Sequence, residues 1–118
     1  MTLNEYAMLA QRTSNQALTI GGHLENGVLG LAGEAGECCD LVKKHSFQDG
    51  RQIRRELLDE LGDVLWYVVE TATALGYSLE TVAENNVSKL KARYPEGFSA
   101  ERSLHREEDG KDPYTDGN

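Results

Sequence analysis

Prolines and cysteines are scarce in this chain, with two of each among 118 residues. Both prolines, Pro95 and Pro113, lie in the last quarter of the chain, so residues 2–94 lack the strongest helix breaker. The adjacent Cys38 and Cys39 would point in different directions from a helix and cannot readily bond to each other. These absences favour an all-α chain whose cysteines are reduced packing residues.

Long apolar runs and net positive charge are also missing. No apolar run approaches the roughly 18 residues of a membrane span, and the first residues lack the basic and apolar regions of a signal peptide. The formal net charge is −8, which argues against binding to nucleic-acid polymers or anionic membranes. We therefore expect a cytoplasmic protein in which a phosphorylated ligand needs a metal or a local group of Lys and Arg.

Start and stop signals predict four main helices. Thr2 and Glu5 form a potential capping box at the first helix, and the glycines of residues 19–22 predict a loop before the second. Gly76 is suited to cap the third helix at its C-terminus, and Ser78 to cap the fourth at its N-terminus. The four helices are expected over residues 2–14, 24–44, 51–75 and 78–93. The predicted fold is a four-helix-type bundle around an antiparallel central helical hairpin.

The length suits a single domain. We expect this domain to occupy residues 1–98. Residues 99–118 are polar and mostly acidic, with little apolar periodicity, and segments of this kind bury too little apolar surface to fold alone. We expect this tail to be partly ordered at most, or ordered only against a partner subunit.

Two acidic motifs, Glu34-x-x-Glu37 and Glu60-x-x-Asp63, each place two carboxylates one helical turn apart. Glu34 and Asp63 are equidistant from Gln48–Asp49, and so are Glu37 and Glu60. A hairpin folded about that point would therefore bring the four acids to two matching levels. Gathered carboxylates repel each other unless a cation lies among them, and hard oxygen ligands favour Mg²⁺, Mn²⁺ or Ca²⁺.

Helical projection places these acids at the edge of the predicted core. At about 100° per residue, Glu60 shares its direction with Leu57 and Val64, and Glu34 lies among Leu31 and Cys38. An unpaired carboxylate beside apolar side chains costs several kcal/mol in effective desolvation. Metal ligation by Glu34, Glu37, Glu60 and Asp63 is the simplest way to offset that cost, whereas solvated surface acids are the ordinary alternative.

Three ordered segments closely resemble the MazG-like branch of the all-α nucleoside triphosphate pyrophosphohydrolases. The first two, Gly30–Glu37 and Glu60–Tyr67, match the family pattern Glu-x-x-Glu, spacer, Glu-x-x-Asp, with 22 residues in the spacer. The third, Asn86–Phe98, is similar to the family signature Asn-x-x-Lys-Leu-x-x-Arg-Tyr-Pro. The resemblance covers about residues 3–98, and three motifs in order are far more specific than one alone.

The resemblance implies hydrolysis of a nucleoside triphosphate to the monophosphate and pyrophosphate, with Mg²⁺, or Mn²⁺ in its place, held by the four acids. House-cleaning of non-canonical nucleotides is one role compatible with that reaction. Glu37 and Glu60 are the candidates for the catalytic proton acceptor, and the sequence does not decide between them. Family members assemble as homodimers or homotetramers, which the wide apolar arc of the third helix suits.

Asn86, Lys89 and Arg93 recur at i, i+3 and i+7 on the fourth helix and form one polar stripe. This stripe could bind the phosphate oxygens of the substrate. Lys and Arg near a helix C-terminus are equally often only partners of the helix dipole. His23 and His105 have no partners at ligand spacing, and we assign neither a role.

Two other functions compete with that of a pyrophosphohydrolase. A carboxylate-bridged di-iron bundle needs Glu-x-x-His motifs, but Glu37 and Asp63 stand where those histidines would be. A non-catalytic helical regulator that binds nucleotide or protein would keep the same fold, although all four family acids are present. Loss of nucleotide turnover in Glu60→Gln, without loss of helicity, would separate enzyme from regulator.

Overall fold

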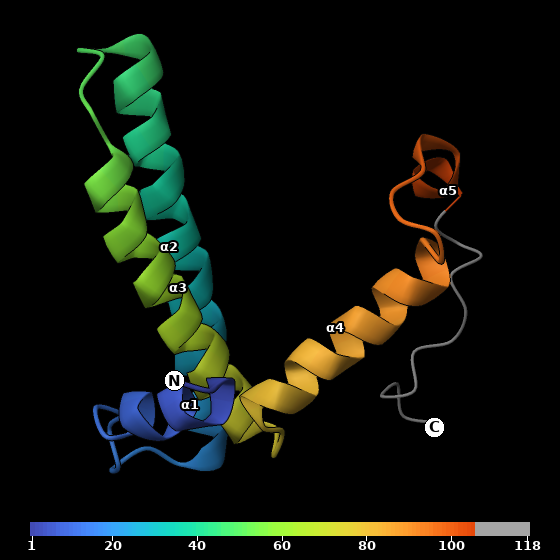
Figure 1. The fold of residues 1–118 in the computed structure, drawn as a ribbon. Helices are drawn as coiled ribbons and strands as arrows, with labels where there is room; N and C mark the ends of the chain where they lie inside the picture. Colours follow the sequence, from blue (N-terminus) through green and yellow to red (C-terminus); the bar gives the residue numbers. More distant parts are fainter. Residues whose placement is uncertain (106–118) are drawn as a thin grey trace. The chain divides into compact units, whose positions relative to one another are not determined.

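The structure is a computed structural model that describes residues 1–105 (Figure 1). Its elements are α1 (Leu3–Gln11), α2 (Ile20–Phe47), α3 (Arg54–Ala74), α4 (Leu79–Arg93) and α5 (Ala100–Leu104). The described residues contain no β-strand, so the predicted all-α class is confirmed. The chain divides into two units, the first comprising Met1–Leu79 and the second beginning at Glu80.

Helices α2 and α3 form the long antiparallel hairpin of the first unit (Figure 1). The two helices approach closely at two glycines of α2. Gly30 lies against the ring of Tyr67, and a Cβ at Gly27 would lie 3.1 Å from the Cα of Thr71. Gly30 and Tyr67 are also equidistant from Gln48–Asp49. The predicted central hairpin is therefore confirmed. The contact between Gly30 and Tyr67 also shows the register that was expected for the pairs of acids.

Helix α1 begins with the predicted capping box. The Thr2 hydroxyl accepts a hydrogen bond from the Glu5 backbone N–H at 3.1 Å, and the Glu5 carboxylate accepts one from the Thr2 backbone N–H at 2.7 Å. The helix ends at Gln11, earlier than the expected Ser14. These reciprocal bonds satisfy N–H groups that have no partner within a helix, which fixes where α1 starts.

The small core of the first unit lies where α1 meets α3. Ala10, Val69 and Leu79 are buried there, and Trp66 packs against them. The Trp66 indole N–H donates to the Thr13 hydroxyl at 2.8 Å and to the Ala10 carbonyl at 3.2 Å. These bonds fasten the C-terminal end of α1 to the middle of α3.

The expected loop at residues 19–22 is wrong, because α2 already begins at Ile20. Thr19 is the N-cap, and its hydroxyl accepts a hydrogen bond from the Gly22 backbone N–H at 3.0 Å. The first turn of a helix lacks internal partners for its N–H groups, so a capping side chain can stabilise a turn that contains glycines. The two glycines therefore begin the helix instead of interrupting it.

The expected ends of α3 and α4 agree with the structure to within a few residues. Gly76 adopts a positive φ of 84° directly after α3, as expected of a glycine at a helix C-terminus. Helix α4 ends at Arg93, two residues before Pro95.

The second unit contains most of α4 together with α5. The rings of Tyr94 and Phe98 pack at 5.6 Å between centroids, and Ser99 caps the five-residue α5. Residues 106–118, the larger part of the predicted tail, lie outside the described residues, and the boundary at residue 98 stays a prediction. None of the described helices combines the length and apolar character needed to span a membrane.

Candidate functional site

Three of the four predicted metal ligands meet on the α2–α3 hairpin. Glu34 of α2 and Glu60 and Asp63 of α3 each direct one carboxylate oxygen to a common region, and these oxygens all lie within 4.8 Å of one another. Glu34 and Glu60 are half-buried, while Asp63 is exposed. The antiparallel register brings Glu34 level with α3, and the i, i+3 spacing adds both acids of that helix.

Glu37 lies outside this group of three acids and is exposed to solvent. Three residues advance an α-helix by about 300°, which leaves Glu37 rotated by about 60° from Glu34 around the helix axis. The expected convergence of the four acids is thus met for three of them. The same i, i+3 spacing keeps Asp63 with Glu60 on α3, so spacing alone does not separate the two pairs; what differs is the face that each helix turns to its partner.

The surroundings of Glu60 in the acid group raise its pKa. The pKa of Glu60 is raised, first by a hydrogen bond with the Glu34 carboxyl group, then by partial burial and by the negative charges of Glu34 and Asp63. No Lys or Arg among residues 1–105 forms an ion pair with these three carboxylates. No positively charged side chain of residues 1–105 therefore neutralises the group by an ion pair. Its all-oxygen donor set fits a hard divalent cation.

Helix α1 approaches the same group through Tyr6. The pKa of the Tyr6 hydroxyl is raised by burial and, to a smaller extent, by the negative charge of Asp63. The sequence motifs did not indicate this interaction between Tyr6 and Asp63.

The predicted substrate-binding residues lie on α4, in the second unit. Asn86 and Lys89 are exposed, and Arg93 is half-buried, with its guanidinium carbon 6.0 Å from the centroid of the Tyr94 ring. The three residues share a face of α4 by their spacing. Their contact with phosphate stays a prediction.

A second polar cluster, which the sequence did not reveal, surrounds Glu70. This carboxylate on α3 is 1% exposed, and it accepts hydrogen bonds from Ser14 at 2.8 Å, from Gln11 at 3.4 Å and from Asn26 at 3.4 Å. His23 Nδ1 lies 3.3 Å from Glu70 Oε2, the oxygen that also accepts from Asn26, and 3.4 Å from the Ser14 hydroxyl. His23, to which we assigned no role from sequence, thus belongs to a buried network.

The donors around Glu70 keep it ionised in spite of its burial. Burial alone would raise the pKa of Glu70, but hydrogen bonds from Ser14, His23 and Gln11 outweigh it and the pKa is lowered. The network joins the end of α1, the segment after it and the start of α2 to α3. The one signal in the sequence was an acid within the apolar run of α3, at residues 64–72.

Comparison with known proteins agrees with this arrangement. The family model described as "MazG nucleotide pyrophosphohydrolase domain" matches residues 23–98, a range that contains all four acids. The chain is also 44% identical over 73 residues to "Gene 37 protein" of Mycobacterium phage L5, a match that covers 58% of this chain and 64% of that protein. The chain therefore spans less than two thirds of that relative. No solved structure matches the chain.

Proposed function

The chain belongs to the MazG nucleotide pyrophosphohydrolase family, and we propose that it hydrolyses nucleoside triphosphates, ribo- or deoxyribo-, to the monophosphate and pyrophosphate. The observation that carries this proposal is the convergence of Glu34, Glu60 and Asp63 from two helices, with one oxygen of each within 4.8 Å of the others. Non-canonical nucleotides are included in the proposed substrate class.

Glu34, Glu60 and Asp63 are the proposed ligands of a divalent cation, Mg²⁺ or Mn²⁺ in its place. A cation bound there would neutralise phosphate oxygens and lower the pKa of a bound water molecule. The positive charge would also offset the mutual repulsion of the three carboxylates, which contributes to the raised pKa of Glu60. Their position on two packed helices holds them in place before the substrate binds.

Glu37 suits the role of proton acceptor better than that of a direct ligand. It lies one turn from Glu34 on α2, but outside the group of three, and its carboxylate is exposed. A carboxylate that is not committed to a cation is free to take a proton from the attacking water. Glu60 is the alternative acceptor. Turnover that persists in Glu37→Gln would exclude Glu37 and leave Glu60, whereas loss of turnover without loss of Mg²⁺ binding in Glu37→Gln would support Glu37.

Asn86, Lys89 and Arg93 are proposed to bind the phosphate oxygens of the substrate. Their polar stripe on α4 supplies positive charge in a chain whose net charge is −8. An amide, an ammonium and a guanidinium group together offer several donors for an anionic chain of phosphates.

The chain is also proposed to form homodimers or homotetramers. Leu58, Leu61 and Leu65 follow one another at i, i+3 and i+7 on α3, with 58%, 60% and 37% of their surfaces exposed. An apolar stripe of this kind on a helix indicates a contact surface for another subunit.

Product analysis tests the proposed reaction directly. Each canonical ribo- and deoxynucleoside triphosphate is incubated with Mg²⁺ and the wild-type protein, and the products are separated by anion exchange. Monophosphate and pyrophosphate are expected, whereas diphosphate with orthophosphate would contradict the proposal. Asp63→Asn should abolish turnover, and Glu25→Gln, which removes an exposed acid of α2 outside the group, should leave it unchanged.

A further inference from the structure

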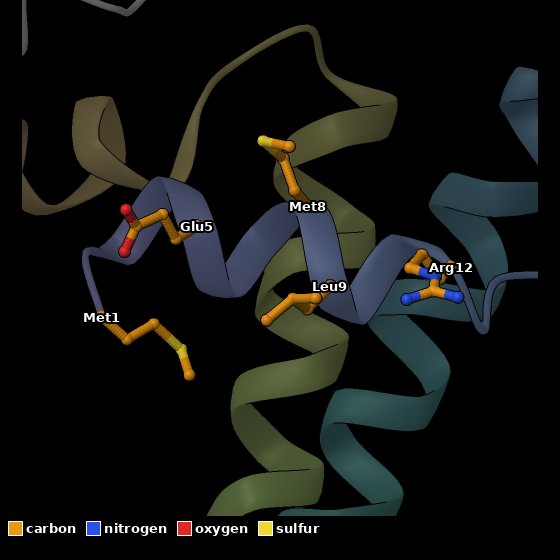
Figure 2. A pocket seen from close by; sticks show the side chains of 5 residues that line it. All are labelled: Met1, Glu5, Met8, Leu9 and Arg12. Atoms are coloured by element: carbon orange, nitrogen blue, oxygen red, sulfur yellow. The ribbon is translucent and has the colours of Figure 1, made fainter.

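The outer face of α1 carries an apolar hollow that the proposed reaction does not use (Figure 2). The hollow measures about 530 Å³ and is lined by Met1, Glu5, Met8, Leu9 and Arg12. At about 100° per residue these positions fall within one arc of the helix. Met8 is 73% exposed and Leu9 is 51% exposed. Besides the face that packs on α3, α1 therefore has a second apolar face open to solvent.

Opposite charges flank this apolar face. Figure 2 shows Glu5 towards one end of α1 and Arg12 towards the other, with Met8 and Leu9 between them. Glu5 and Arg12 are two helical turns apart, about 10.5 Å along the axis, which is too far for them to pair with each other. Arg12 forms no ion pair within residues 1–105.

The two charges are placed symmetrically along the helix. The midpoint between Glu5 and Arg12 falls between Met8 and Leu9, the two large apolar residues of the hollow. A two-fold axis exchanges positions that are equidistant from it, so a surface with this symmetry is complementary to its own copy.

We propose that a second copy of this chain covers the hollow, with the two α1 helices antiparallel about a two-fold axis between Met8 and Leu9. Each Glu5 then faces Arg12 of the other copy, and the apolar side chains are buried at the axis. A parallel arrangement would place Glu5 against Glu5 and Arg12 against Arg12. Like charges that face each other across an interface oppose association, so the antiparallel arrangement is favoured.

The small size of α1 makes this contact weak. Helix α1 has nine residues and is about 13.5 Å long. A helix of this length is too short to bury the roughly 800 Å² on each partner that is typical of a stable interface. The contact therefore depends on protein concentration and adds to any interface on the hairpin. The contact uses none of the proposed catalytic residues. If the contact is absent, the mass of the assembly shows it; if the proposed reaction is absent, nucleotide turnover shows it.

Sedimentation velocity at high protein concentration tests the contact. Met8→Glu places a charge at the two-fold axis, and we expect this variant to have half the mass of the wild type. Ile20→Glu is the matched control, because Ile20 is 74% exposed and lies outside the hollow; its mass should equal that of the wild type. Equal masses for Met8→Glu and wild type would overturn the proposal.

A charge-exchange experiment tests the orientation. In Arg12→Glu two acids would face each other, and in Glu5→Lys two bases would, so each variant alone should associate at least about tenfold more weakly than the wild type at low ionic strength. Mixing the two variants restores both opposite-charge pairs, and the heavier species should return. A mixture no heavier than its components would overturn the antiparallel arrangement, because loss of the Glu5 cap alone could not be rescued by mixing.

Discussion

Ser14 and Glu70 are joined by a buried hydrogen bond of 2.8 Å although 56 positions separate them along the chain. Their side chains are 7% and 1% exposed, and the same carboxylate also binds side chains of α1 and α2. An ionised carboxylate accepts hydrogen bonds only, and Gln11, Ser14 and Asn26 each donate one to it. Together with the hydrogen bond from Trp66 to Thr13, this carboxylate holds the connection between α1 and α2 against α3.

Replacement of Glu70 by glutamine should destabilise the first unit. The new amide group would bring a donor among donors, and an unsatisfied buried polar group costs about 1–3 kcal/mol. Urea unfolding followed by circular dichroism measures the loss. Glu25→Gln, which removes the same charge from an exposed position, should change the free energy of unfolding by less than about 0.5 kcal/mol. Equal effects would mean that net charge, and not the network, is responsible.

The contribution of Glu70 should disappear in acid. Because its folded-state pKa is below the ordinary value of 4.5, the stabilisation is fully present above that value and is lost as the pH falls through the lower folded-state pKa. The difference in unfolding free energy between wild type and Glu70→Gln should therefore shrink from neutral to acidic pH. A difference that grows in acid would show that the sign is reversed.

Two glycines of α2 should respond in opposite directions to alanine. Gly27→Ala should be destabilising by about 1–3 kcal/mol, because its Cβ would press against the backbone of Thr71 in a packed interface. Gly33 has open space where a Cβ would lie, so Gly33→Ala should stabilise α2 by about 0.5–1 kcal/mol through helix propensity. Thermal unfolding of both variants checks this contrast.

The acid group should reduce stability when no cation is present. The pKa of Glu60 is raised by the hydrogen bond with Glu34, by burial and by the nearby negative charges, all of which disfavour its ionised form, so Glu60→Gln should have a higher melting temperature than the wild type in chelator at neutral pH. Added Mg²⁺ should then raise the melting temperature of the wild type but not that of the variant. A Mg²⁺-induced shift of equal size in both proteins would argue against Glu60 as a ligand.

Neutralising the stripe on α4 should weaken substrate binding more than catalysis. If Lys89 contacts phosphate oxygens in both the ground state and the transition state, Lys89→Gln should raise KM with little change in kcat. Lys91, an exposed lysine on the same helix, provides the control Lys91→Gln. Equal, unchanged kinetics for both variants would assign Lys89 to the helix dipole alone.

Much of the fold follows from local features of the sequence. Helix ends are set by groups a few residues apart: the capping box of Thr2 and Glu5 begins α1, and Gly76, with its positive φ, follows the end of α3. The lack of proline before Pro95 leaves the helices between them uninterrupted. The hairpin register also followed from sequence, because motif positions equidistant from a turn meet in antiparallel helices. Gly21 and Gly22 misled because their role depends on whether Thr19 caps a helix.

The tertiary structure alone decided which acids meet and which are buried. Glu37 and Glu34 look equivalent in the sequence, but only Glu34 lies with Glu60 and Asp63, because the face of α2 that is turned to α3 includes Glu34. Glu70 became a buried network residue only through donors as distant as Gln11 and Ser14. Helix ends depend on neighbours along the chain, whereas convergence and burial depend on how two or three helices turn their faces to one another, which no single segment specifies.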